Sequence, residues 1–181
     1  GTLRLGGNGA LPANGSVVLD PVFGGSATLD INGVSTAAIG SLTLRGSGGA
    51  VSTVTGGGTL NLGGSVFFNA ASQPGPATIS VTSLALGSAT RVFNVGDSPT
   101  AATDLAISSA VSGTGGITKQ GAGTLGLLNS ANLFSGPVLV NDGMLSVPVT
   151  GALPAGANVT VDATSGSATL ALGGAPRRWL G

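Results

Sequence analysis

The residues that could do chemistry gather in one glycine-rich stretch, GTGGITKQGAGTL, which runs from Gly113 to Leu125. Gly121, Gly123 and Gly126 satisfy the Gly-x-Gly-x-x-Gly pattern of dinucleotide sites, and Lys119 could supply a counter-charge to phosphate. That pattern needs a helix that opens at its third glycine, because the helix N-terminus holds the pyrophosphate. The residues that follow, LGLLNSANLFSG, favour turns over a helix. We therefore interpret these glycines as corners of a chain that turns repeatedly.

Carboxylates for catalysis or metal binding come only from aspartate: Asp20, Asp30, Asp97, Asp104, Asp142 and Asp162. Acid–base catalysis needs two titratable groups across a substrate, and calcium needs a cluster of carboxylate oxygens. The aspartates are spread along the chain and favour turns, where Asp bonds its own backbone. Without His or Cys, the chain offers neither a base for a serine nucleophile nor a thiolate ligand. We expect no catalytic residue, no metal and no cofactor.

The composition favours short strands and tight turns. Of the 181 residues, 34 are glycine and only 7% are charged, and the net charge is zero. A neutral chain has no electrostatic reason to bind nucleic acid or an anionic membrane. No apolar run reaches the roughly 18 residues of a membrane helix, and GTLRLGGNGA has no signal-peptide anatomy. If the protein is exported, we expect its signal outside this chain.

A short phrase, Thr-Leu-x-Leu or Thr-Leu-x-Ile, occurs at Thr2, Thr28, Thr59, Thr124 and Thr169. Its aliphatic residues alternate with polar ones, which is the period of a strand with one buried face. Glycine corners follow several copies and allow sharp turns. We expect one inward-facing column that contains Leu3, Leu29, Leu60, Leu125 and Leu170.

A longer duplication links the two ends of the chain. Residues 1–33 match residues 143–174, and GALPA stands in both copies. Strand, corner and strand at roughly 20 residues per round is typical of a β-solenoid, in which each round buries its inner face against its neighbours. We predict an all-β solenoid of about eight or nine coils, with one domain at 1–174 and a tail at 175–181. A β-sandwich or jelly roll is the alternative.

The segment 110–147 resembles the autotransporter-associated β-strand repeat. The matching residues are Gly113, Gly115, Gly116, Ile117, Thr118, Lys119, Gly121, Gly123, Thr124, Leu125, Asn132, Phe134, Gly136 and Gly143. Met144 departs from the pattern, which usually has Thr there. The resemblance implies a right-handed, single-stranded parallel β-helix in the passenger region of a bacterial surface or secreted protein. It implies no catalytic activity.

Three further expectations concern single side chains. Asn129, Asn132 and Asn141 could stack as an amide ladder along one corner. Most phenylalanines are expected in the core. Arg177, Arg178 and Trp179 lie in a tail outside the repeat and could close one end of the rod or contact a neighbour.

These features predict a non-enzymatic extracellular module: a stalk, spacer, adhesive surface or fibre subunit. The expected partner is the protein itself, by end-to-end stacking, because open solenoid ends expose unpaired strands. A surface glycan or a host matrix is a second expected partner. One alternative is a polysaccharide-processing enzyme, which would show a cleft lined by Asp and Arg. The other is a glycan-binding adhesin, which would show a row of exposed aromatic residues.

Overall fold

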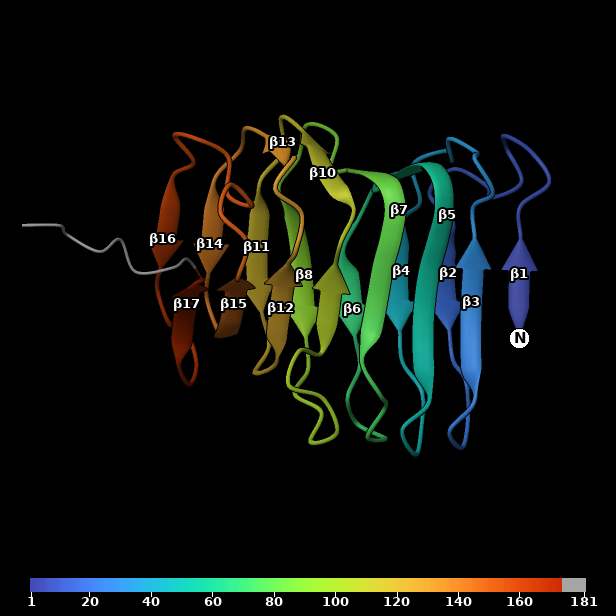
Figure 1. Ribbon diagram of the computed structural model, residues 1–181, viewed down its shortest axis with the longest axis horizontal. Coiled ribbons are helices and arrows are strands. Elements are labelled where there is room, and N and C mark those ends of the chain that lie inside the picture. Colours follow the sequence, from blue (N-terminus) through green and yellow to red (C-terminus); the bar gives the residue numbers. More distant parts are fainter. Residues whose placement is uncertain (174–181) are drawn as a thin grey trace, which may run out of the picture.

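Stacked parallel strands make up the computed structural model of the protein, which describes residues 1–173. Figure 1 shows the coils following one another along the long axis, with β1 (Thr2–Arg4) at one end and β17 (Ala168–Leu172) at the other. The chain winds in a right-handed sense, up along one sheet and down along the other. Every strand pairing within residues 1–173 is parallel, which confirms the β-solenoid and contradicts the sandwich.

Two sheets form the walls of the solenoid. Sheet A has ten strands: β1, β3 (Ser26–Asp30), β5 (Val51–Asn61), β7 (Ala77–Ala85), β9 (Leu105–Ile107), β12 (Thr124–Leu127), β15 (Gly143–Val147) and β17, with β10 (Ala110–Gly113) and β13 (Leu133–Phe134) on a side branch. Sheet B has seven strands: β2 (Ser16–Leu19), β4 (Ser41–Leu44), β6 (Val66–Phe68), β8 (Arg91–Val95), β11 (Ile117–Gln120), β14 (Val138–Val140) and β16 (Val159–Val161).

The coils are longer and fewer than the sequence predicts. Sheet B has one strand per coil and therefore counts seven coils, where eight or nine were expected. Leu29 pairs with Val54 and Val54 with Ile79, so these coils have about 25 residues. The later coils are shorter: Leu105, Leu125 and Leu145 are spaced by 20 residues in sheet A, and Ile117, Val138 and Val159 by 21 in sheet B. In the 25-residue coils the extra residues lie in the loops between strands. These loops do not alternate between apolar and polar residues, so the repeated strand phrase gives no measure of their length.

Inward side chains stack in columns along the axis. Leu29, Val54, Ile79 and Ile107 are all fully buried and pair in register from one coil to the next. The expectation of one column for the five leucines of the repeated phrase is wrong in detail. Leu125 and Leu170 belong to a neighbouring column, and Leu60 lies on a third side. Leu3 is in register with Leu29 but 56% exposed, because β1 is the end strand.

The third side arises where β5 and β7 bend. Their pairing register shifts between Gly56 and Thr59. Gly56 and Gly58 have φ angles of 104° and 92°, a region that L side chains rarely adopt, so glycine lets the strand turn there. Beyond the bend, Ser83 pairs with both Thr59 and Ala110, and β10 pairs with β13. The core is thereby enclosed by two main sheets and this shorter wall.

The duplicated segments occupy equivalent places in the two end coils. Residues 1–33 contain β1, β2 and β3, and residues 143–173 contain β15, β16 and β17 in the same sheet order. Within residues 1–173 no helix is long and apolar enough to cross a membrane.

Candidate functional site

Lys119 lies inside the solenoid. It pairs in register with Phe93 on one side and Val140 on the other, so it occupies the inward column of sheet B. Its side chain is fully buried, and Nζ donates hydrogen bonds to the carbonyls of Gln120 at 2.9 Å, Gly121 at 2.6 Å and Asp142 at 3.0 Å. Burial lowers the pKa of Lys119 to about 8, while the charges of Asp142 and Asp104 oppose that shift. The ammonium group therefore bonds the backbone carbonyls of one corner inside the solenoid and does not face a ligand.

The candidate phosphate loop is a corner that leads into a strand. Gly121 turns the chain with φ 77°, and Thr124–Leu127 then continues as β12 instead of a helix. Gly123 leaves no room for a side chain, because a Cβ there would collide with the carbonyl of Gly96 on the preceding coil. The same close approach of a neighbouring backbone holds at several repeat glycines: Gly113, Gly115, Gly116, Gly136 and Gly143. These positions need glycine for coil stacking, in keeping with the corner interpretation.

Asp104, one of the six candidate carboxylates, is a second buried charge. Its carboxylate accepts the Ser98 N–H at 2.8 Å and the Thr124 N–H at 2.7 Å. Burial raises the pKa of Asp104, and the two backbone hydrogen bonds oppose the shift. Thr124 lies on the following coil, so Asp104 links successive coils through the backbone. The only sequence signal is an aspartate directly before the apolar strand LAI.

The predicted asparagine ladder is not what the structure shows. Asn132 is buried and bridges coils through the backbone: Oδ1 accepts the Val111 N–H at 2.8 Å, and Nδ2 donates to the Ala152 carbonyl at 2.7 Å. Asn129 donates to the Ser108 carbonyl at 2.8 Å. Asn141 follows sheet B, at a different corner, and its Oδ1 is buried without a partner within residues 1–173. Asn132 and Asn129 thus bond backbone groups of neighbouring coils instead of stacking amide on amide.

The remaining predicted positions fall in two groups. Phe134 and Leu125 are buried in the core, as are Phe68 and Phe93, whereas Phe23 and Phe67 are 88% and 39% exposed. Arg177, Arg178 and Trp179 lie outside the described residues.

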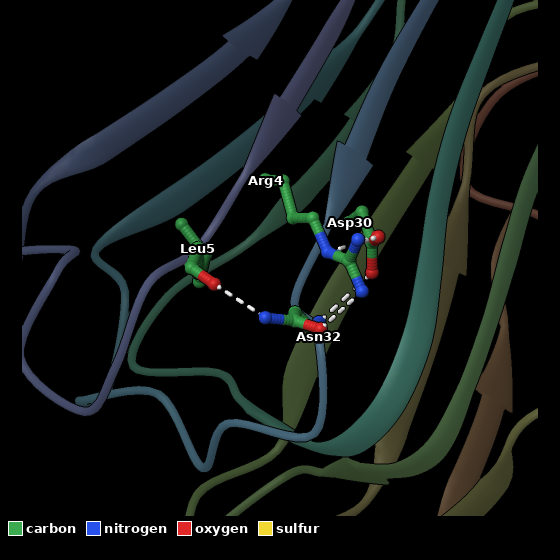
Figure 2. Close-up of polar contacts among 4 residues, drawn as sticks. All are labelled: Arg4, Leu5, Asp30 and Asn32. Atoms are coloured by element: carbon green, nitrogen blue, oxygen red, sulfur yellow. Dashed lines mark hydrogen bonds and ion pairs between the residues drawn. The ribbon is translucent and has the colours of Figure 1, made fainter.

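At one end, surface polar groups tie the first two coils together, as Figure 2 shows. Arg4 forms an ion pair with Asp30 at 3.3 Å and donates to Asn32 Oδ1 at 2.6 Å. Asn32 Nδ2 in turn donates to the Leu5 carbonyl at 3.0 Å. Arg4 is 67% exposed, so this contact adds little stability.

An open groove follows the ends of four strands of sheet B. Its larger part has a volume of about 550 Å³, lined by Thr43, Phe67, Phe68, Asn69, Ala70, Ala71, Asn94, Gly96 and Asp97. A smaller part of about 310 Å³ shares Asn69 and Ala71 and is lined also by Asp20, Val22, Arg45, Gly46, Ser47 and Ser72. We call the two parts together the sheet B groove. The sheet B groove carries both an aromatic ring, Phe67, and charged side chains.

The carboxylates of this groove lie on distant coils. Asp20 follows β2 and Asp97 follows β8, and the register places three strand spacings, about 14 Å, between those strands. Carboxylate pairs that hydrolyse glycosidic bonds lie roughly 5 to 9.5 Å apart. Asp20 is paired with Arg45 at 2.9 Å. Within residues 1–173, no three side chains of the metal-ligating types cluster together.

Comparison with known proteins finds one similarity to report. Over 111 residues, 61% of this chain, the sequence is 37% identical to the BmaC autotransporter adhesin of Brucella suis biovar 1 (strain 1330). The chain spans about 3% of the length of that adhesin. No protein-family model matches, so the specific repeat family stays an expectation. No solved structure matches.

Proposed function

We propose that this chain is a structural segment of the passenger region of a bacterial autotransporter-like protein, displayed at the cell surface or secreted. The observation that carries the proposal is the unbroken parallel stack of coils through residues 1–173. A stack of this kind makes an extended rod that holds surfaces away from the cell. The partial similarity to an autotransporter adhesin supports the same reading and adds adhesion as a role.

The internal chemistry suits an exported rod. The chain has no cysteine, so its stability comes from packed columns and from hydrogen bonds between coils. The charged side chains that are buried, Lys119 and Asp104, are bonded to backbone groups of successive coils. The hydrogen bonds link successive coils, and burial leaves both groups without access to a substrate.

The polysaccharide-processing alternative has less support. The sheet B groove does hold Asp and Arg, as that alternative requires. However, Asp20 is tied to Arg45, and its distance from Asp97 exceeds that of a hydrolytic carboxylate pair. We therefore propose a non-enzymatic role.

We also propose that the ends of the stack contact further coils, of the same polypeptide or of a second copy. Within residues 1–173, β1 pairs with β3 alone, and Leu3 is 56% exposed on that strand. At the opposite end, Leu172 of β17 is 67% exposed. Exposed parallel edges with apolar side chains pair readily with another strand. Filament formation by the purified chain, seen by electron microscopy, would support self-contact, and uniformly short particles at high concentration would contradict it.

The location can be tested directly with antibodies raised against the folded 181-residue chain. We expect them to label intact cells of the organism that makes the protein, or its culture medium. A control antibody against a cytosolic protein should label only lysed cells. Labelling of the chain that also requires lysis would contradict the proposal.

A further inference from the structure

We propose that the sheet B groove binds a neutral glycan chain, with Phe67 as the platform for a sugar ring. This inference rests on the proposed surface function and deepens it by naming a ligand class. Its failure would leave the structural role intact, because the stack of coils does not depend on the groove.

The groove has the size and position of a ligand site. Its larger part, about 550 Å³, falls in the usual range for ligand pockets. The groove crosses four neighbouring coils, since Asp20, Arg45, Asn69 and Gly96 directly follow paired strands. Three strand spacings give it a length of about 14 Å, which suits a chain of rings better than a single small molecule.

The ring of Phe67 lies at the surface, where it can contact a ligand, and does not pack in the core. It lies on the outer face of β6, next to the buried Phe68, and is 39% exposed. Its neighbours in register are Thr43 and Asn94, both lining the groove. An exposed ring flanked by hydroxyl and amide groups can pack on the apolar face of a sugar while its neighbours bond the hydroxyls.

The polar groups of the groove can both donate and accept. Asn69 Oδ1 accepts the Ala71 N–H at 3.0 Å, which fixes the amide while its own N–H donors take no part in that bond. Asn94 and Thr43 add further donors and acceptors. Such groups match sugar hydroxyls, which also do both.

The charges of the groove favour a neutral ligand. Arg45 is held by Asp20 at 2.9 Å, and Asp97 is exposed on the groove wall. In the lining of the groove two carboxylates, Asp20 and Asp97, stand against the one cation Arg45, so the net negative charge disfavours sulfate, phosphate and uronic acid groups. A carboxylate can accept hydrogen bonds from the hydroxyls of an uncharged sugar.

The test uses the 181-residue chain with neutral hexasaccharides of glucose, mannose and N-acetylglucosamine, and with a heparin-derived hexasaccharide as the acidic probe. Titration is followed by calorimetry and by NMR of a ¹⁵N-labelled sample. We expect at least one neutral probe to bind and to shift the side-chain amides of Asn69 and Asn94. Phe67→Ala should weaken binding about tenfold. The matched control Leu133→Ala removes a side chain that is 78% exposed on β13 and should change nothing.

Three results would contradict the proposed glycan site. Binding of the acidic probe alone, no binding of any neutral probe at millimolar concentration, or equal affinity of Phe67→Ala and Leu133→Ala would each overturn the proposal. Circular dichroism of the two variants shows whether each is still folded. Asp97→Asn should leave neutral binding within about twofold, because the amide still accepts a hydrogen bond.

Discussion

The ammonium group of Lys119 donates a 3.0 Å hydrogen bond to the backbone carbonyl of Asp142, which lies one coil further along the stack. Lys119 thus fills a place in the inward column between Phe93 and Val140, where apolar residues stand on the other coils. In sequence Lys119 resembles a lysine that binds phosphate, but in the structure it links two coils through buried hydrogen bonds. Such buried contacts between coils should contribute to the stability of the fold.

Replacing Lys119 by methionine should destabilise the fold by about 2 kcal/mol. Methionine fills a similar volume but leaves the carbonyls of Gln120, Gly121 and Asp142 without this donor. Urea unfolding followed by circular dichroism measures the change. Thr118→Ala, on the outer face of the same strand, is the control and should stay within about 0.5 kcal/mol. Unchanged or increased stability of Lys119→Met would show that the hydrogen bonds do not repay burial of the charge.

The stability of the native chain should rise with pH on the alkaline side. Burial lowers the pKa of Lys119 to about 8 from 10.5, so between these values the unfolded chain binds more protons than the folded one. The free energy of unfolding therefore increases with pH through this window, and the burial penalty is present in full below about pH 8. The chain has no Tyr, Cys or His to titrate there. The urea midpoint of the native chain should rise with pH across this window, whereas that of Lys119→Met should not change. An equal rise in both proteins would show that Lys119 is not the group that titrates.

Gly123→Ala should destabilise the solenoid by about 2–3 kcal/mol. The new Cβ would collide with the backbone carbonyl of Gly96, and the stacked coils leave little freedom to move apart. Gly57→Ala is the matched control, since its Cβ would lie 3.5 Å from the nearest atom, an ordinary contact. Thermal unfolding of both variants makes the comparison. Equal melting temperatures would mean that the coils are spaced more widely than described.

The sequence predicts the stacked architecture well because each coil of a solenoid repeats the same alternation of inward and outward residues. Alternation in strands such as TLDI and TLGL identifies the inward residues Leu29 and Leu125. Coil length was predicted less well, because the loops that vary between coils carry no alternating signal. Leu29 and Leu60 occupy the same place in the repeated phrase but lie on different sides of the solenoid. The bend between Gly56 and Thr59 separates them, and it shows only in the pairing register of β5 and β7.

The candidate site was harder to predict. Lys119 and Asp104 are buried because of what lies on adjacent coils, and a charged residue in one strand does not reveal its neighbours. The sheet B groove brings together Phe67, Asn69 and Asn94 from separate coils. Their convergence depends on the register between β6 and β8, which no repeated phrase marks.

Asn132→Ala should cost about 3 kcal/mol of stability, more than Asn129→Ala. Asn132 is buried and satisfies both the Val111 N–H and the Ala152 carbonyl, whereas Asn129 makes its contact to Ser108 at the surface, where water can replace it. The Asn129 variant should lose less than about 1 kcal/mol. Chemical unfolding of the pair decides the order, and a larger loss for Asn129→Ala would contradict the bridging role of Asn132.

Spin-label distances along sheet A test the stacking of coils most directly. The chain has no cysteine, so pairs of labels can be placed cleanly at Ala171 with Thr28, Thr53 or Thr78. Register places these partners six, five and four strands away from Ala171. Pulsed electron resonance should give separations of about 29, 24 and 19 Å, falling by one strand spacing at each step. Separations that do not fall in this order, or that are equal for all three pairs, would contradict the solenoid.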